Sequence, residues 1–278
     1  MNERNPTPRL KWHMLRRRKS DAPFLRENLV AALHAGAACE VDLNFTADGH
    51  ALCLHDATLD RETSGQGRVA DATRAEIERL RQRSPTGAVL TTAPLFLDEV
   101  VDIAQSIGVA EPALVQLDVK TRAQALTRDA CERLARTIGD GADTFIASAY
   151  EWDTVRRLVD ATAGLHAGFD PLVFYPRTFD LAAEAYRAIA ARTLATAPGA
   201  SIYYLEARLI LAALERDVNL VHEVGVTGAR VDAWTIDPEF PNLRDALRRL
   251  VHAGVAQITT NDPEQLAPII AESATAPR

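Results

Sequence analysis

The sequence is poor in the features that mark secreted and membrane proteins. Only three of its 278 residues are cysteines. Cys39, Cys53 and Cys131 are odd in number and stand in apolar contexts, so we expect buried reduced thiols and not a disulfide framework. The N-terminus has no apolar core of signal-peptide length, and no apolar run is long enough to span a bilayer. We therefore predict a cytoplasmic protein without stable membrane insertion.

An excess of positive charge is also missing. The chain has 31 Lys and Arg against 38 Asp and Glu, which gives a formal net charge of −7. This balance argues against a polyanion as the main partner, and nucleic acid binding is not expected. Hydrophobic residues make up 47% and charged residues 25% of the chain, as in ordinary globular proteins. The oligomeric state is left open.

Strand-like and helix-like segments alternate along the chain. Helix-like stretches separate about eight strand candidates, and among them a helix is expected at 72–82 and a long helix at 206–225. The strand candidates are near 9–13, 38–45, 113–121, 143–149, 164–169, 201–205, 229–236 and 255–260. Eight parallel strands alternating with helices is the number that a closed barrel needs. We predict an α/β fold, a TIM (β/α)8 barrel, as a single domain over 1–278 with its core at about 10–270.

Residues 39–56 contain one segment that breaks this alternation. CEVDLNFTADGHALCLHD reads as two strands joined at Asp48-Gly49. The connection is too short for the crossover that parallel strands require. We therefore predict a small hairpin excursion after the second strand and not a barrel strand.

Carboxylates cluster where strands of this barrel would end. Glu40 and Asp42 share one face of the second strand, because side chains alternate with a period of two. Asp118 and Lys120 share a face of the third. Three converging acids are costly without positive charge, and carboxylate oxygens suit Mg²⁺ or Ca²⁺. The sequence therefore predicts one divalent cation at a barrel mouth; the alternative is that the acids are exposed or paired with arginine.

Two histidines stand near these acids. His13 follows the first strand. His55 ends the hairpin, and the period of two in the second hairpin strand puts its side chain on the face that approaches Glu40 and Asp42. Imidazoles flanking a metal-held anion are suited to general acid and base work near neutral pH. The other histidines are read as structural or surface residues.

These residues resemble the signatures of the glycerophosphodiester phosphodiesterase family. The resemblance rests on Glu40-x-Asp42, on Thr46-Ala47-Asp48-Gly49, on His55-Asp56, on Leu59-Asp60-Arg61-Glu62-Thr63 and on the glycines of 64–69. Later matches are Trp234-Thr235-Ile236-Asp237 and Thr259-Thr260-Asn261-Asp262-Pro263. The resemblance covers about residues 10–270, and its middle, about 150–230, matches only in pattern.

The resemblance implies a metal-dependent phosphodiesterase on a TIM barrel, which releases an alcohol and glycerol phosphate from a small-molecule phosphodiester. It assigns acid/base catalysis to His13 and His55. It assigns the metal to Glu40, Asp42 and Asp118, and places Lys120 near the phosphate. We add Arg16, from the basic run 16–19, as a further phosphate contact and Trp234 as a wall of the substrate groove. The alternatives are that Arg16 belongs to a solvated basic run and that Trp234 packs in the core.

Two departures leave other activities open. Met14 stands where the family usually has Arg, and Asp118-Val119-Lys120 replaces its usual Glu-x-Lys. Both features are similar to sphingomyelinase D-type phospholipases, which implies a phospholipase D-like transphosphatidylation that gives a cyclic phosphate from lysolipids. A second alternative is a catalytically weak barrel that binds a phosphorylated metabolite. Retention of both histidines and of all three acids argues against it.

Overall fold

The computed structural model describes residues 7–275. Its strands belong to one sheet. Hydrogen bonds order nine strands as β1-β9-β8-β7-β6-β5-β4-β2-β3, and β1 also pairs with β2. This is the strand order of the predicted closed (β/α)8 barrel with one additional antiparallel strand. The bounds are β1 Arg9–Trp12, β2 Ala38–Phe45, β3 Ala51–Cys53, β4 Val115–Val119, β5 Phe145–Ser148, β6 His166–Phe169, β7 Ile202–Glu206, β8 Arg230–Trp234 and β9 Gln257–Thr260.

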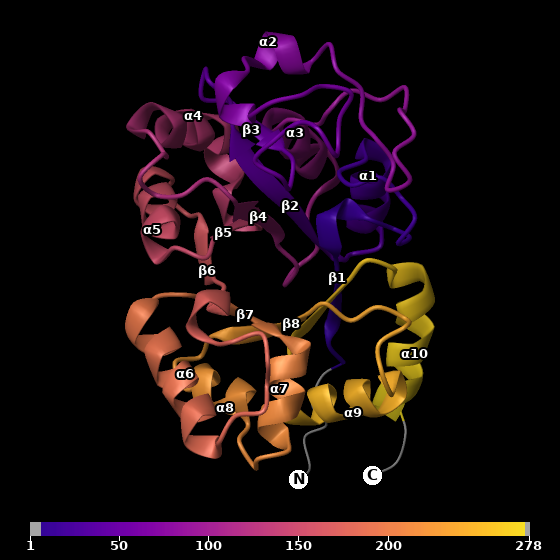
Figure 1. The fold of residues 1–278 in the computed structure, drawn as a ribbon, viewed down its shortest axis with the longest axis vertical. Coiled ribbons are helices and arrows are strands. Elements are labelled where there is room, and N and C mark those ends of the chain that lie inside the picture. The colour runs from indigo at the N-terminus through magenta and orange to yellow at the C-terminus, as the bar shows by residue number, and fades with distance from the viewer. Residues whose placement is uncertain (1–6, 276–278) are drawn as a thin grey trace. The chain divides into compact units, whose positions relative to one another are not determined.

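The chain divides into two compact units, which are described separately. The first, here the N-terminal unit, is Trp12–Ala167. Its helices α1, α3, α4 and α5 contact one another in that order, as Figure 1 shows. The bounds are α1 Arg26–His34, α2 Arg74–Ile77, α3 Leu97–Ile107, α4 Arg128–Ile138 and α5 Trp152–Ala161.

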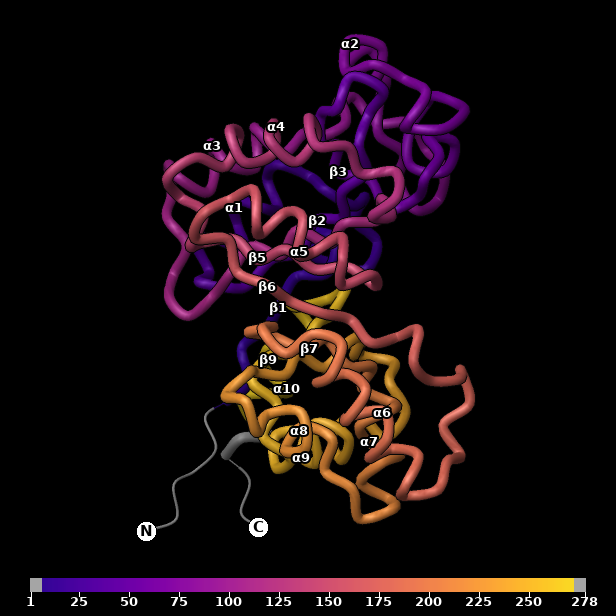
Figure 2. The backbone as a smooth tube through the Cα atoms, turned by 90° about the vertical axis from the view of Figure 1, so that its left-hand side faces the viewer, coloured from indigo at the N-terminus to yellow at the C-terminus, as the bar shows by residue number. Residues whose placement is uncertain are grey.

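The second, here the C-terminal unit, is Met1–Lys11 with Gly168–Arg278. Its α6 packs on α8 and its α7 on α9, and these helices can be followed in orange and yellow in Figure 2. The bounds are α6 Ala183–Thr196, α7 Ala207–Leu214, α8 Leu220–Gly225, α9 Leu243–Ala253 and α10 Pro263–Thr275. The prediction of a single domain stays a prediction, and its ends, 1–6 and 276–278, lie outside the described residues.

The hairpin excursion is confirmed. β3 pairs antiparallel with β2, with Leu43 opposite Cys53 and Phe45 opposite Ala51. The connecting turn contains Gly49 at a φ of +76°, a left-handed conformation that glycine adopts without strain. Because β3 runs back along β2, the residues that follow β3 return to the level of Asp42 on β2.

The centre of the N-terminal unit is β2, and all eight of its residues are buried. Strands of a parallel barrel are covered on both faces, which explains why β2 is apolar on its outward side. There Cys39, Val41 and Leu43 join the core formed with the helices. All three cysteines are buried and free, as predicted.

Two predicted helices are wrong in extent. The segment 206–225 is two helices, because Asp217 has a φ of +57° and the side chain of Asn219 caps a new helix by accepting from the N–H of His222. The helix expected at 72–82 ends after one turn, at Ile77. Gln82, the last residue of the expected helix, is instead buried, and its side chain donates to the carbonyl of Pro23. A tertiary contact therefore outweighs helix propensity there.

No helix among residues 7–275 combines the length and the apolar character that crossing a membrane requires.

Candidate active site

Strand register brings the two predicted halves of the acidic site together. In the parallel pair β2–β4, Glu40 stands opposite Gln116 and Asp42 opposite Asp118. In the next pair, Asp118 stands opposite Ser148 of β5. Side chains at the same level of neighbouring strands point to the same face, so Glu40, Asp42 and Asp118 converge.

Glu40, Asp42 and Asp118 form a buried carboxylate cluster. One oxygen of each lies within 4.8 Å of the others, and all three residues are buried. Asp42 is fully buried, and burial raises the pKa of its carboxyl against the lowering effect of Lys120. Neither Asp42 oxygen accepts a hydrogen bond in the described part of the chain. A buried carboxylate in this position requires a compensating cation.

Lys120 supplies part of that compensation. Its Nζ lies 2.9 Å from Oδ1 of Asp42 and donates to Oδ2 of Asp118. Burial alone would lower the pKa of Lys120, but Asp118 and Asp42 outweigh burial and raise it. The lysine is therefore charged, and it offsets part of the negative charge of the carboxylate cluster.

Asp118 is held in place by neutral donors on its other side. Ser148 Oγ donates to Oδ1 of Asp118 at 2.7 Å, and Gln116 Nε2 donates to Ser148 Oγ at 2.8 Å. These two linked hydrogen bonds fix the rotamer of Asp118 and direct its second oxygen toward Lys120. The possible ligand atoms of the three acids are all oxygens, and Asp42 lacks hydrogen bonds from the described residues. These two observations fit a hard divalent cation.

His13 lies beside this cluster. It begins the single 3-10 turn His13–Leu15 that follows β1, and its Nε2 is 3.6 Å from Oε1 of Glu40. The next residue, Met14, is 4% exposed and packs in the core. A side chain at this position therefore faces the interior. Arg16 is half-buried and its N–H donates to the carbonyl of His13, whereas the neighbouring Arg17 and Arg18 are exposed.

His55 is positioned by the loop that follows β3. The Leu54 N–H donates to the carbonyl of Asp42, which extends the pairing with β2. From β2, Asn44 Nδ2 donates to the carbonyls of Leu54 at 2.8 Å and Asp56 at 3.1 Å. His55 is close enough to Asp42 for its charge to lower the pKa of that carboxyl. Both predicted histidines thus lie in the same unit as the acids.

The Asp56 carboxylate orients the His55 ring. Nδ1 of His55 lies 2.9 Å from Oδ1 of Asp56. Arg61 donates to both oxygens of Asp56, at 2.6 and 2.7 Å, and these bonds, followed by the one from His55, lower the pKa of Asp56 to about 2. An ionised carboxylate only accepts, so Nδ1 carries the proton and Nε2 is left for chemistry.

Glu62 completes the support of this loop. It is 4% exposed, and its Oε2 accepts the backbone N–H of His55 at 3.2 Å. Its Oε1 accepts from Arg61 at 2.6 Å. Burial raises the pKa of Glu62, and the His55 N–H and Arg61 oppose that shift. Arg61 therefore bridges Asp56, which contacts the His55 ring, and Glu62, which accepts the His55 backbone N–H.

Trp234 ends β8 in the C-terminal unit, in register with Glu206 of β7. Its indole Nε1 is buried and has no hydrogen-bond acceptor among the described residues. Such a donor is suited to a ligand oxygen, although its role in substrate binding stays a prediction.

Reasoning from sequence missed Asn44 and the supporting roles of Arg61 and Glu62. The signal for Asn44 was present, because it continues the period of two from Glu40 and Asp42. Arg61 and Glu62 carried no such signal, since neither belongs to a regular element and their partners are set by the loop.

Comparison with known proteins identifies the family of the chain. Residues 27–265 match the model of the Glycerophosphoryl diester phosphodiesterase family. The chain belongs to this family. A curated glycerophosphodiester phosphodiesterase from Caldanaerobacter subterraneus subsp. tengcongensis is 25% identical over 261 residues, which is 91% of this chain and 95% of the relative. Bovine glycerophosphodiester phosphodiesterase 1 is 45% identical over 65 residues, 22% of this chain and 19% of that protein.

Solved structures share the fold. A putative glycerophosphoryl diester phosphodiesterase from Silicibacter pomeroyi superposes with a TM-score of 0.71 at 19% identity, over 96% of this chain and 94% of the other. An Oleispira antarctica phosphodiesterase, solved with the product sn-glycerol-3-phosphate, superposes with a TM-score of 0.68 at 16% identity, over 95% and 97% of the two chains. The predicted family and barrel fold are confirmed, and the protein is a phosphoric diester hydrolase.

Proposed function

We propose that the protein hydrolyses glycerophosphodiesters to an alcohol and glycerol phosphate, using two histidines and one divalent cation. The observation that carries the proposal is the buried cluster of Glu40, Asp42 and Asp118 with His13 and His55 beside it. Further support comes from the name of the Caldanaerobacter relative and from the glycerol phosphate bound by the Oleispira protein.

Glu40, Asp42 and Asp118 are the residues that would hold the cation. A bound divalent ion would supply positive charge to a non-bridging phosphate oxygen, where negative charge grows in the transition state. Mg²⁺ and Ca²⁺ both prefer the oxygen ligands present here, so the proposal includes either ion. The preference between the two ions is measured by adding each ion separately to the metal-free protein and comparing the activity that is restored.

The two histidines exchange protons with the substrate in this proposal. One removes the proton from a neighbouring substrate hydroxyl, whose oxygen attacks phosphorus, and the other protonates the leaving alkoxide as its bond to phosphorus breaks. This first step gives the alcohol and a cyclic phosphate, and a water molecule then opens the cyclic phosphate to glycerol phosphate in a second step. Asp56 keeps the proton of His55 on Nδ1 and so presents Nε2 to the substrate. The Nε2 of His13 lies 3.6 Å from Oε1 of Glu40.

The remaining predicted residues bind the substrate in this proposal. Lys120 is charged and partly buried, and its ammonium adds to the positive field at the phosphate. Arg16 is the half-buried member of its basic run and so is the one that we assign to phosphate. Trp234 offers an unsatisfied indole N–H to a substrate oxygen. We also keep the cytoplasmic location and the small-molecule substrate as parts of the proposal.

Product analysis tests the reaction. Glycerophosphocholine and a lysophospholipid are each incubated with the protein and a divalent cation, and the phosphorus-containing products are identified by ³¹P NMR. The proposal expects glycerol phosphate from glycerophosphocholine, and loss of the product when chelator is added. A cyclic phosphate from the lysophospholipid alone would assign the protein to the transphosphatidylation reaction instead. Absence of any product would indicate the phosphometabolite-binding barrel.

A further inference from the structure

Ser148 supports the acidic cluster from the strand next to β4. It is the last residue of β5, it stands opposite Asp118 in the parallel register, and it is fully buried. Its Oγ donates to Oδ1 of Asp118 at 2.7 Å. Because solvent does not reach the Ser148 side chain, bulk water does not compete for this hydrogen bond. Oδ1 of Asp118 therefore has a fixed donor.

Gln116 sets the direction of the Ser148 hydroxyl. It precedes Asp118 by two residues on β4 and so lies on the same face of that strand. Gln116 is 4% exposed, and its Nε2 donates to Oγ of Ser148 at 2.8 Å. A hydroxyl has one proton to donate, so an amide N–H on its acceptor side commits that proton to Asp118. Gln116 and Ser148 thus form one directed relay that ends on Oδ1 of Asp118.

The other oxygen of Asp118 has a partner of a different kind. Oδ2 accepts from the ammonium of Lys120, which also lies 2.9 Å from Oδ1 of Asp42. Lys120 is a long side chain with several rotatable bonds and is 14% exposed, whereas Ser148 is short and enclosed. The ammonium has room to move aside for a cation, and the relay does not. Oδ2 is therefore the oxygen of Asp118 that a cation would use.

The other two acids are arranged in a similar way. Asp42 has Oδ1 beside the ammonium of Lys120, and Glu40 has Oε1 3.6 Å from Nε2 of His13. One ligand oxygen from each acid is enough to bring Glu40, Asp42 and Asp118 within 4.8 Å of one another. The cluster is thus built to offer one oxygen per carboxylate.

The number of oxygens that each acid supplies decides which ion fits. Ca²⁺ takes about six to eight oxygen ligands in flexible geometry and often binds a carboxylate through both oxygens. Mg²⁺ is smaller, requires near-ideal octahedral geometry and keeps several water molecules. The two oxygens of one carboxylate lie too close together to occupy neighbouring corners of an octahedron around so small an ion. Three acids that each supply one oxygen therefore match the requirement of Mg²⁺.

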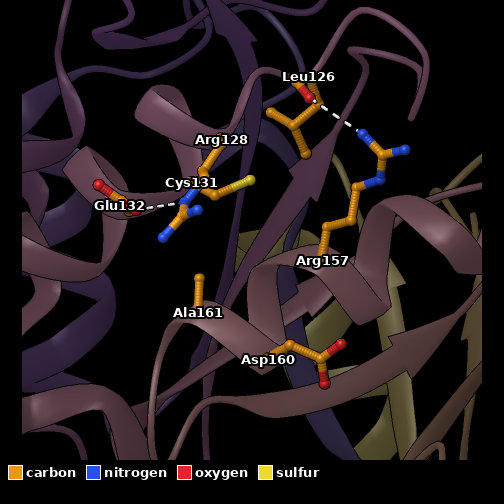
Figure 3. Close-up of a pocket in the computed structure, with 7 residues that line it drawn as sticks. All are labelled: Leu126, Arg128, Cys131, Glu132, Arg157, Asp160 and Ala161. Atoms are coloured by element: carbon orange, nitrogen blue, oxygen red, sulfur yellow. Dashed lines mark hydrogen bonds and ion pairs between the residues drawn. The ribbon is translucent and has the colours of Figure 1, made fainter.

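A pocket of about 570 Å³ between α4 and α5 also contains acids but does not suit a cation (Figure 3). Glu132 and Asp160 line it together with Arg128 and Arg157. Arg128 donates to Glu132 at 2.7 Å, and both acids are near the surface. The positive charge of the two arginines opposes a divalent ion there.

The loop after β3 holds a second group of possible ligands. His55, Asp56 and Glu62 approach one another as closely as the three acids of the cluster do. Arg61 donates to both carboxylates of this group, at 2.6 Å to each. A guanidinium already compensates these acids, so we assign the cation to Glu40, Asp42 and Asp118 alone.

We propose that Gln116 and Ser148 are positioning residues that hold Asp118 to binding through one oxygen, and that they thereby make the acidic site prefer Mg²⁺ to Ca²⁺. The inference rests on the proposed function, because it takes from that proposal a divalent cation held by the three acids. Loss of the relay would release Oδ1 of Asp118, and a carboxylate that turns both oxygens to the ion favours the larger cation.

Calorimetric titration of the metal-free protein with Mg²⁺ and with Ca²⁺, without substrate, tests the relay. We expect the wild type to bind Mg²⁺ more tightly than Ca²⁺. Ser148→Ala should weaken Mg²⁺ binding about 10–100-fold, the usual effect of losing an outer-shell partner. Ca²⁺ binding should change less, because the released Oδ1 becomes a ligand. The ratio of Mg²⁺ to Ca²⁺ affinity should then fall by about tenfold or more.

Three further variants separate this role from a structural one. Thr193→Val is the matched control, since Oγ1 of Thr193 is a fully buried hydroxyl of α6 that donates to the carbonyl of Ile189 at 2.8 Å. It should lower the melting temperature and leave both affinities unchanged. Ser148→Thr keeps the hydroxyl and should retain the wild-type ratio. Gln116→Met leaves the Ser148 hydroxyl without direction and should lower the ratio as well, even if Ser148→Ala folds poorly.

The possible outcomes distinguish the inference from the proposed function. An unchanged affinity ratio in both Ser148→Ala and Gln116→Met would overturn the role of the relay and leave the cation site intact. Tighter binding of Ca²⁺ than of Mg²⁺ by the wild type would do the same. If neither ion binds to the wild type, the cation site of the proposed function is itself wrong, and the inference is overturned with it.

Discussion

The ammonium of Lys120 lies 2.9 Å from Oδ1 of Asp42, a carboxylate that is fully buried and accepts no hydrogen bond from the described residues. The lysine therefore provides the charge without the directional bond that a buried carboxylate normally receives. This relationship explains how two acids and a lysine coexist in the barrel interior, and it leaves Asp42 with the capacity to bind a second cation.

Replacing Lys120 with Met should destabilise the metal-free protein by about 3–5 kcal/mol, because removal of one partner leaves buried charge uncompensated. Denaturant unfolding in chelator measures the change. Arg128→Met, which removes a cation from an 89% exposed side chain, should cost at most about 1 kcal/mol. Excess divalent cation should restore part of the loss in Lys120→Met. Equal stability of the two variants would contradict the role of Lys120.

Replacing Glu40 with Gln should raise the divalent-ion concentration needed for half-maximal activity by about 100-fold or more, since loss of an outer-shell partner alone costs about 10–100-fold. Activity titrations with Mg²⁺ and Ca²⁺ measure this requirement. Glu132→Gln, an acid paired with Arg128 on α4, is the control and should behave as the wild type. If turnover of the wild type is indifferent to chelator, the metal site is wrong.

Replacing His55 with Ala should lower kcat by about 10²–10⁴-fold, the usual contribution of a general acid or base. The His55 side chain is 43% exposed, so the melting temperature should change little. His34→Ala, an exposed histidine in α1, should leave both kcat and melting temperature near the wild-type values. Near-normal turnover in His55→Ala would refute the assignment.

Replacing Asn44 with Leu should lower kcat more than it changes KM. The buried Nδ2 of Asn44 donates to the backbone on both sides of His55, and loss of these bonds frees that loop. The carbonyl of the buried Leu54 and that of the partly buried Asp56 also lose a donor, which should cost about 1–3 kcal/mol of stability. Steady-state kinetics and thermal melts measure the two effects. A change confined to stability would show that Asn44 does not position His55.

The Asp56 pKa of about 2 predicts a pH dependence of stability. A folded-state pKa below the ordinary aspartate value of 3.8 means that the ionised form is stabilised in the native protein. The contribution is complete above about pH 4 and is lost as pH falls toward 2. The difference in melting temperature between wild type and Asp56→Asn should therefore shrink over that interval. Asp102→Asn, at an exposed position of α3, is the control, and a difference that stays constant from pH 5 to pH 2 would disagree with this account.

Much of the site follows from local patterns. The period of two along 38–45 places Glu40, Asp42 and Asn44 on one face, and alternation of strands and helices places that face inside a barrel. The same pattern put Asp118 and Lys120 on a neighbouring strand. In contrast, the break of the segment 206–225 and the early end of α2 depend on a left-handed Asp217 and on the tertiary contact of Gln82, which propensity does not encode.

The sequence by itself determined the family, the barrel, and which residues could reach a common site, because hydrophobic periodicity and short motifs are local properties. Only the tertiary structure decided which of them are neighbours. Strand register, set by packing between segments more than 70 residues apart, places Asp42 opposite Asp118. Loop conformation places Arg61 against Asp56. Both depend on the summed contacts of the folded chain, and no single stretch of sequence contains them.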